Sequence, residues 1–129
     1  MRKIFTNKQI LDYAYALQEA FLKQEQEVVL PTKANFYLQK NINTMIRNAE
    51  EIEKAKIRIG QRYGEYVEEE KVYRITDIKK QQQAQKELED LMSVDQILEI
   101  YFISFEDLQD VQLTTLQMHA MFFMLEEEE

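Results

Sequence analysis

The chain contains no cysteine and a single histidine, His119. The absence of cysteine excludes disulfides, thiolate zinc sites and thiol nucleophiles. His119 has no second histidine with which to share a metal, and a lone helical histidine seldom acts as a ligand or a general base. Ser93 and Ser104 have no candidate base close to them in the sequence. We therefore expect a protein that is not an enzyme and that has no catalytic residues, no metal ligands and no cofactor.

Glycine and proline are also scarce, with two and one among 129 residues. Two glycines cannot build a phosphate-binding loop, and so few turn-forming residues favour long helices over a sheet-rich fold. No stretch approaches the 18 or so consecutive apolar residues of a membrane span, and the first residues lack the apolar segment of a signal peptide. The expectation is a soluble protein of the bacterial or host-cell cytoplasm that contacts no membrane.

Basic residues are missing from the last third of the chain. The first 64 residues carry 11 basic and 7 acidic residues, a net charge of +4, whereas residues 65–129 carry 5 and 17, a net charge of −12. From Glu87 to Glu129 there are twelve acidic residues and no basic one. Such a charge run fits either a solvated surface or an acidic surface that attracts a basic partner. Direct nucleic-acid binding is not expected of this half, because affinity for phosphates requires lysine and arginine.

The length fits one domain, residues 1–129, which opens with two helices in residues 1–64. Asn7 is a candidate cap for a first helix of about Lys8 to Gln24, in which apolar residues recur at helical spacing. Thr32 is the candidate cap of a second helix that ends at about Tyr63, before Gly64. Because the link between the two helices is short, we expect them to pack as a long antiparallel hairpin.

The second helix carries two patterns of seven-residue spacing. An apolar seam runs from Leu38 to Tyr63, and its members Met45 and Ile52 are expected to be buried against Leu17 and Phe21. The opposite side carries a basic stripe that consists of Lys33, Lys40, Arg47 and Lys54. This stripe is either a solvated helix face or a strip that meets the acidic surface of a partner or of another copy of the chain.

Residues 65–125 form the smaller α+β part of the prediction. An acidic loop, residues 65–70, precedes a short strand, Lys71 to Ile75, and a third helix that starts at Thr76 or Asp77 and ends at about Met92. The stretch from Ile97 to Phe105 is apolar on both faces and predicts a covered strand, which could pair with residues 71–75. The predicted fold class is therefore helix-dominated α+β.

A last helix is predicted from the sequence Thr-Thr-Leu-Gln, in which Thr114 and Gln117 have the spacing of a capping box. This helix continues to about Leu125 and is apolar nearly all round. It is either buried between the strand and the hairpin, or it offers a partner a surface formed by Met118, Met121, Phe122 and Leu125. Residues 126–129 are four glutamates, whose charge opposes the helix dipole, and we expect this tail to fray.

The order of several segments suggests a family. These segments are Leu30-Pro31, Asn35 to Asn41, a long helix that ends in Arg62-Tyr63-Gly64, Glu87 to Leu91, Phe105 to Leu108, and the turn from Thr114 to Gln117. In this order, over residues 30–125, the chain resembles the small, acidic, uncharacterised proteins that bacteriophages of gut and Gram-positive bacteria encode. The resemblance implies a phage accessory protein that inhibits a host protein or helps to assemble the particle, and it implies no catalytic residues.

Three functional hypotheses remain open at this point. The first is a non-enzymatic, phage-type binding protein that disables a host protein, such as a component of antiviral defence. The second is a structural or assembly protein, or a chaperone of a virion component, that associates with itself through its helices, with a homodimer as the expected state. The third is a carboxylate-metal enzyme, for which Glu87, Asp90 and Asp107 are the candidate ligands.

Overall fold

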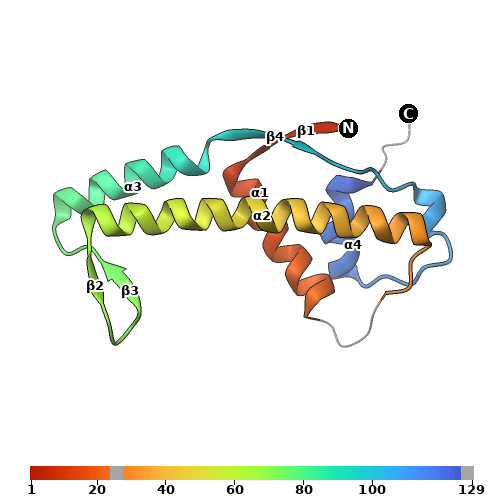
Figure 1. Ribbon diagram of the computed structural model, residues 1–129, viewed down its shortest axis with the longest axis horizontal. Coiled ribbons are helices and arrows are strands. Elements are labelled where there is room, and N and C mark those ends of the chain that lie inside the picture. Colours follow the sequence, from red (N-terminus) through yellow and green to blue (C-terminus); the bar gives the residue numbers. More distant parts are fainter. Residues whose placement is uncertain (24–27, 126–129) are drawn as a thin grey trace.

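The computed structural model describes residues 1–23 and 28–125 (Figure 1). In chain order the elements are β1 (Arg2–Thr6), α1 (Asn7–Leu17), a π-helical turn η1 (Gln18–Leu22), α2 (Thr32–Tyr63), β2 (Glu65–Val67), β3 (Val72–Arg74), α3 (Ile78–Met92), β4 (Asp95–Glu99), a 3₁₀ turn η2 (Phe105–Leu108), α4 (Thr115–Met121) and a 3₁₀ turn η3 (Phe122–Met124). The fold is helix-dominated α+β, as the sequence predicts. None of the helices within the described residues is long and apolar enough to cross a membrane.

Side chains cap the starts of α3 and α4, and the cap of α4 is the predicted one. The Asp77 side chain accepts a hydrogen bond of 2.8 Å from the backbone N–H of Lys79 and so caps α3. Thr114 and Gln117 form both hydrogen bonds of a capping box at the start of α4. The α-helix is shorter than predicted, because after Met121 the chain tightens into η3 before Leu125 becomes extended.

The first helix begins differently from the prediction. Thr6 is its cap and forms a capping box with Gln9, so the assignment of Asn7 as the cap is wrong. Asn7 is buried: its side chain donates to the Leu91 carbonyl at 2.8 Å and accepts from the Gln96 amide at 2.6 Å. Asn7 therefore ties the start of α1 to the segment that joins α3 to β4. The predicted end of this helix, Gln24, lies outside the described residues.

The strand pairing also differs from the prediction. Residues 71–75 do not pair with residues 97–105. Instead β3 pairs with β2 in a local hairpin, and β4 pairs with β1 in a second antiparallel ribbon whose central pair is Ile4 and Ile97. The local hairpin closes a short loop, which costs less chain entropy than a distant pairing. The stretch predicted as one strand ends as a strand at Glu99, and Ile103 then forms an isolated bridge with Leu125.

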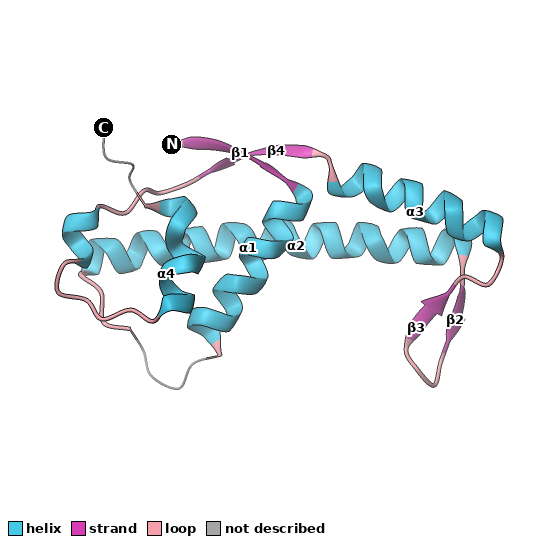
Figure 2. Cartoon of the chain, turned by 180° about the vertical axis from the view of Figure 1, so that it is seen from behind, coloured by secondary structure: helices cyan, strands magenta, loops and turns pink. Residues whose placement is uncertain are grey.

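The α2 helix passes through two environments (Figures 1 and 2). Near its middle α1 crosses it obliquely, and α4 packs on α1 and η1. In this part Met45 and Ile52 are buried in one core cluster with Leu17, and Phe21 packs against that cluster half-buried, which agrees with the predicted seam. We call the described residues outside 53–90 the core region.

The second half of α2 continues beyond this core, with α3 lying along it and the β2–β3 hairpin at its end (Figure 1). We call residues 53–90 the arm. All residues of the arm are described, and Ala84 is the one among them that is buried. The arm is therefore a thin layer of two helices and a hairpin, whereas the core region encloses a true hydrophobic core.

Candidate protein-binding surface

The structure separates the four candidate residues of the C-terminal helix. Met121 is 0% and Leu125 4% exposed, and both belong to the core cluster. Met118 is half-buried, whereas Phe122 is 69% exposed. The physical reason is the change from α-helix to 3₁₀ turn after Met121, which ends with Leu125 pairing to Ile103. The four residues do not form one exposed face, and Phe122 alone offers the surface that the sequence analysis assigned to the group.

The basic stripe, by contrast, lies on the exposed side of α2, from Lys33 to Lys54. Lys33, Lys40, Arg47 and Lys54 are all exposed, and none of them forms an ion pair with a residue in the ranges 1–23 and 28–125. Two of the four have aromatic neighbours. The Lys33 ammonium lies 5.5 Å from the centre of the Tyr37 ring, and the Lys40 ammonium lies 5.4 Å from that of Phe36.

Exposed aromatic rings gather at the same end of α2. The Tyr37 ring lies with its centre 5.2 Å from that of Tyr101 and 6.3 Å from that of Phe36. Phe36 is 54% exposed, Tyr101 is exposed and Tyr37 is half-buried. We call Lys33, Phe36, Tyr37, Lys40 and Tyr101 the aromatic–lysine surface. It combines rigid, amphipathic rings with two cations that have no carboxylate partner among the described residues.

A buried asparagine holds this surface together. Asn41 is 0% exposed, and its side-chain oxygen accepts a hydrogen bond of 2.9 Å from the backbone N–H of Tyr101. Its side-chain nitrogen donates to the Tyr101 carbonyl at 2.8 Å and lies 3.4 Å from the sulfur of Met124. Asn41 thus satisfies both backbone groups of Tyr101 as a neighbouring strand would. This contact fixes the position of the Tyr101 ring against Tyr37.

A pocket of about 310 Å³ adjoins the aromatic–lysine surface. Its lining consists of Met1, Lys33, Tyr37, Ile100, Tyr101, Phe102, Ser104 and Asp107. This volume is at the lower end of the range for small-molecule sites, and Ile100 gives the pocket a fully buried apolar residue. The pocket therefore suits one side chain or a small chemical group.

The charged residues in the first half of α2 are all basic. Thr32 to Ala49 contains Lys33, Lys40 and Arg47 and no acidic residue. Acidic residues return at Glu50, after which the signs mix, and Lys56 pairs with Glu53 at 3.5 Å. The first half of α2 thus presents a cationic strip on a chain whose net charge is −8.

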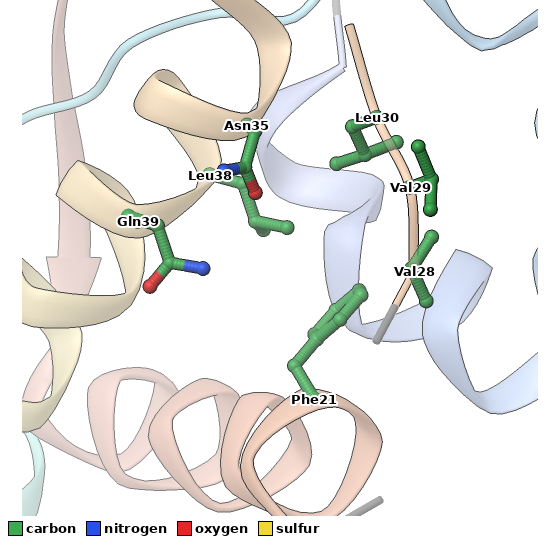
Figure 3. Close-up of a pocket in the computed structure, with 7 residues that line it drawn as sticks. All are labelled: Phe21, Val28, Val29, Leu30, Asn35, Leu38 and Gln39. Carbon is green, nitrogen blue, oxygen red and sulfur yellow. The ribbon is translucent and has the colours of Figure 1, made fainter. Parts of the chain in front are cut away.

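A second pocket, of about 330 Å³, lies between the end of the first helix and the start of α2 (Figure 3). Phe21, Leu30 and Leu38 give it apolar walls, and the amides of Asn35 and Gln39 lie at its α2 side. Residues 24–27, which connect Phe21 to Val28, lie outside the described residues. For that reason we assign no ligand to this pocket.

The three carboxylates considered for a metal site do not come together. Glu87 and Asp90 line a groove between α2 and α3. In this groove Glu87 accepts a hydrogen bond of 2.7 Å from Arg62. Asp107 lines the separate pocket beside Lys33. Within residues 1–23 and 28–125, no three His, Asp or Glu side chains are grouped so that they could hold a metal ion.

Comparisons of the chain with protein-family models, with curated proteins and with solved structures found no match. The chemistry of the chain's own surface is therefore what points to its function.

Two residues of the aromatic–lysine surface, Lys33 and Lys40, could be predicted from the sequence, and the three aromatic residues were not predicted. Lys33 and Lys40 were found through their seven-residue spacing. The adjacent pair Phe36 and Tyr37, one helical turn from each lysine, was the signal that could have revealed the rings on the helix. No local signal points to Tyr101, which lies 60 residues from Asn41 in the chain and is brought to α2 by the fold.

Proposed function

We propose that the protein acts by binding a protein partner through the aromatic–lysine surface, with no chemistry of its own. The observation that carries this proposal is the cluster of the exposed rings Phe36 and Tyr101 with the half-buried ring of Tyr37, beside two lysines that have no carboxylate partner among the described residues. Aromatic residues dominate the energetic centres of protein interfaces because they bury a large area at a small cost in side-chain entropy.

The position of the rings supports the same proposal. Rings that are mobile when free must be ordered on binding, and each ordered side chain costs about 0.5–1.5 kcal/mol. Here Tyr101 is already held through its backbone by Asn41, and Tyr37 packs against it from α2. The surface is therefore preorganised, and less of the interaction energy is lost in ordering it.

The biological role that we propose is that of a phage-type accessory protein in the host cytoplasm, which disables or redirects a host protein. An antiviral defence component is the kind of target that such a role implies. The resemblance in segment order over residues 30–125 and the surface described above support this role. A binding protein of this kind needs no active site, because occupying a functional surface of the target is enough to inhibit it.

Affinity capture from bacterial lysate, read by quantitative mass spectrometry, tests the proposal. The wild type is compared with Tyr101→Ala and with the matched control Tyr15→Ala, since Tyr15 is an exposed tyrosine on α1 outside the surface. We expect a host protein that the wild type and Tyr15→Ala retain and that Tyr101→Ala loses. Equal recovery by all three, or no protein above background, would contradict the proposal.

Self-association, the second candidate function, is favoured by one specific observation. The outer face of the β1–β4 ribbon exposes the directly opposed side chains Ile4 and Ile97, which are 63% and 65% exposed. A two-fold homodimer would bury such a pair twice. Sedimentation of the wild type and of Ile97→Asp tests this candidate: a dimer that the substitution converts to a monomer would support it, and a monomeric wild type would dispose of it.

A further inference from the structure

We infer that the partner segment that docks on the aromatic–lysine surface is acidic and places one apolar side chain in the adjoining pocket of about 310 Å³. This inference rests on the proposed function, because it names the chemistry of the partner. It follows from three features of the described residues: the cations without carboxylate partners, the exposed rings and the pocket.

The cations of the first half of α2 are evenly spaced along the helix. Lys33, Lys40 and Arg47 are seven residues apart on one helix, so their positions repeat about every 10 Å along the axis. No acidic residue interrupts Thr32 to Ala49, and none of the three forms an ion pair with a described residue. Carboxylates placed on a partner helix at every seventh position would meet the three cations in register. Such pairs fix orientation and register more than they add affinity.

The affinity must therefore come from apolar contact. The rings of Phe36 and Tyr101 are exposed beside the lysines, and the residues that line the pocket next to them include Met1, Tyr37 and Phe102. An apolar or aromatic side chain of the partner that enters this pocket would be covered by Tyr37 and Tyr101. Ser104 and Asp107 line the same pocket and supply polar groups for the partner's backbone.

Single-stranded nucleic acid is the competing occupant, since rings and lysines also bind bases and phosphates. Two observations favour the acidic protein segment. The net charge of −8 repels a polyanion at long range, whereas a short segment carries few charges. The cations of the surface are also few, and tight binding to a phosphate backbone depends on neutralising many phosphates.

The probe is a fluorescently labelled helical peptide of about three heptads, with glutamate at every seventh position and one phenylalanine between two glutamates. Fluorescence anisotropy measures its affinity for the wild type, for Lys40→Glu and for the matched control Lys54→Glu. Lys54 belongs to the same stripe and is equally exposed, but it lies in the arm, away from the rings. We expect Lys40→Glu to weaken binding about tenfold or more, because like charges then face each other, and Lys54→Glu to change it less than about threefold.

Two further probes complete the test. The same peptide with lysine in place of glutamate should bind at least about tenfold more weakly to the wild type, and an oligouridine of similar length should not compete. Three results would overturn the inference. The first is an equal loss of peptide affinity in Lys40→Glu and Lys54→Glu. The others are binding of the lysine peptide as tight as that of the glutamate peptide, and binding of the oligonucleotide tighter than that of the peptide. Circular dichroism checks that both variants keep their helices. If this test fails while capture of a host protein still depends on Tyr101, the proposed function stands and only the partner chemistry is wrong.

Discussion

The core region and the arm share one helix, but they bury it differently. In the core region the α2 side chains of Leu38, Ile42 and Met45 are almost completely buried in a cluster with β1, α1, α4 and η3. In the arm the same helix has α3 along one side, and Ile59 is half-buried while Ile57 is exposed. The seven-residue seam thus continues from one region into the other while the number of layers that cover it falls.

This difference in burial indicates that the two regions differ in the free energy of local opening. Regions with few buried apolar contacts open at a lower free energy than the global unfolding. We therefore expect the arm to open locally while the core region stays folded. The aromatic–lysine surface lies on the core region, and a surface that binds through preorganised rings requires that support.

The largest expected effect comes from two seam positions, one in each region. Met45→Ala should lower the free energy of unfolding by about 2–5 kcal/mol, because it leaves a cavity in the core. Ile59→Ala in the arm should cost about 1–2 kcal/mol, because the side chain is half-buried and loses less apolar contact. Urea denaturation measures both, with Lys54→Ala as the exposed control. An equal loss in the free energy of unfolding for Met45→Ala and Ile59→Ala would contradict the difference in burial between the core region and the arm.

The next effect concerns the asparagine that supports the binding surface. Asn41→Leu leaves the N–H and the carbonyl of Tyr101 without their partner, at a cost of about 1–3 kcal/mol for each group that stays buried. The matched control is Asn48→Leu, because the Asn48 side chain donates to a carbonyl within its own helix, that of Thr44. Thermal denaturation should show a clear loss for the first variant and a change within about 0.5 kcal/mol for the second.

A smaller and more local effect is expected at the junction of the arm. Gly64 ends α2 in an extended conformation, and a Cβ added there would lie 2.8 Å from the Arg74 carbonyl oxygen and 3.0 Å from that of Gly60. Gly64→Ala must therefore displace the β2–β3 hairpin, at a cost of about 1–3 kcal/mol. Hydrogen exchange should show faster exchange in residues 65–74 and unchanged protection of Met45. Loss of protection in both places would mean that the arm and the core region unfold as one unit.

The smallest effect is expected for the ion pair that joins the two helices of the arm. Arg62 and Glu87 are 2.7 Å apart, and the Arg62 side chain is largely exposed. Exposed ion pairs contribute about 0–1 kcal/mol, and salt screens them. Arg62→Gln should therefore lower stability by no more than about 1 kcal/mol, and the difference should shrink in high salt. A larger, salt-independent loss would show that the arm depends on this contact for its packing.

The helices were the part of the fold that the sequence could predict. α2 ends at Tyr63, as expected from Gly64, and starts at Thr32, which lies inside the helix and does not cap it; Pro31 and Gly64 flank an apolar seam that Lys56 interrupts. α3 and α4 start where Asp77 and Thr114 cap them. These signals are local, since each depends on side chains within about one helical turn of the backbone that they satisfy. The same locality explains the prediction of the basic stripe, which depends only on spacing along one helix.

The errors concern contacts between distant parts of the chain. β1 was missed because its pairing with β4 joins residues about 90 positions apart in the chain. The assignment of Asn7 as a cap failed because its partners are Leu91 and Gln96. A polar side chain before an apolar helix caps it or is buried, depending on what packs over it. Only the tertiary structure supplies that neighbour.

The amino-acid sequence thus determined which segments are helical, where the long helix carries its cations and its apolar seam, and which kinds of catalytic chemistry lack their residues. The tertiary structure decided which apolar residues remain exposed. It buried Met121 and Leu125 by turning the chain after α4, and it left Phe36 and Tyr101 in contact with solvent beside Lys33 and Lys40. The physical reason is that helical periodicity is a property of neighbouring residues, whereas burial depends on the segments that the whole chain brings to each face.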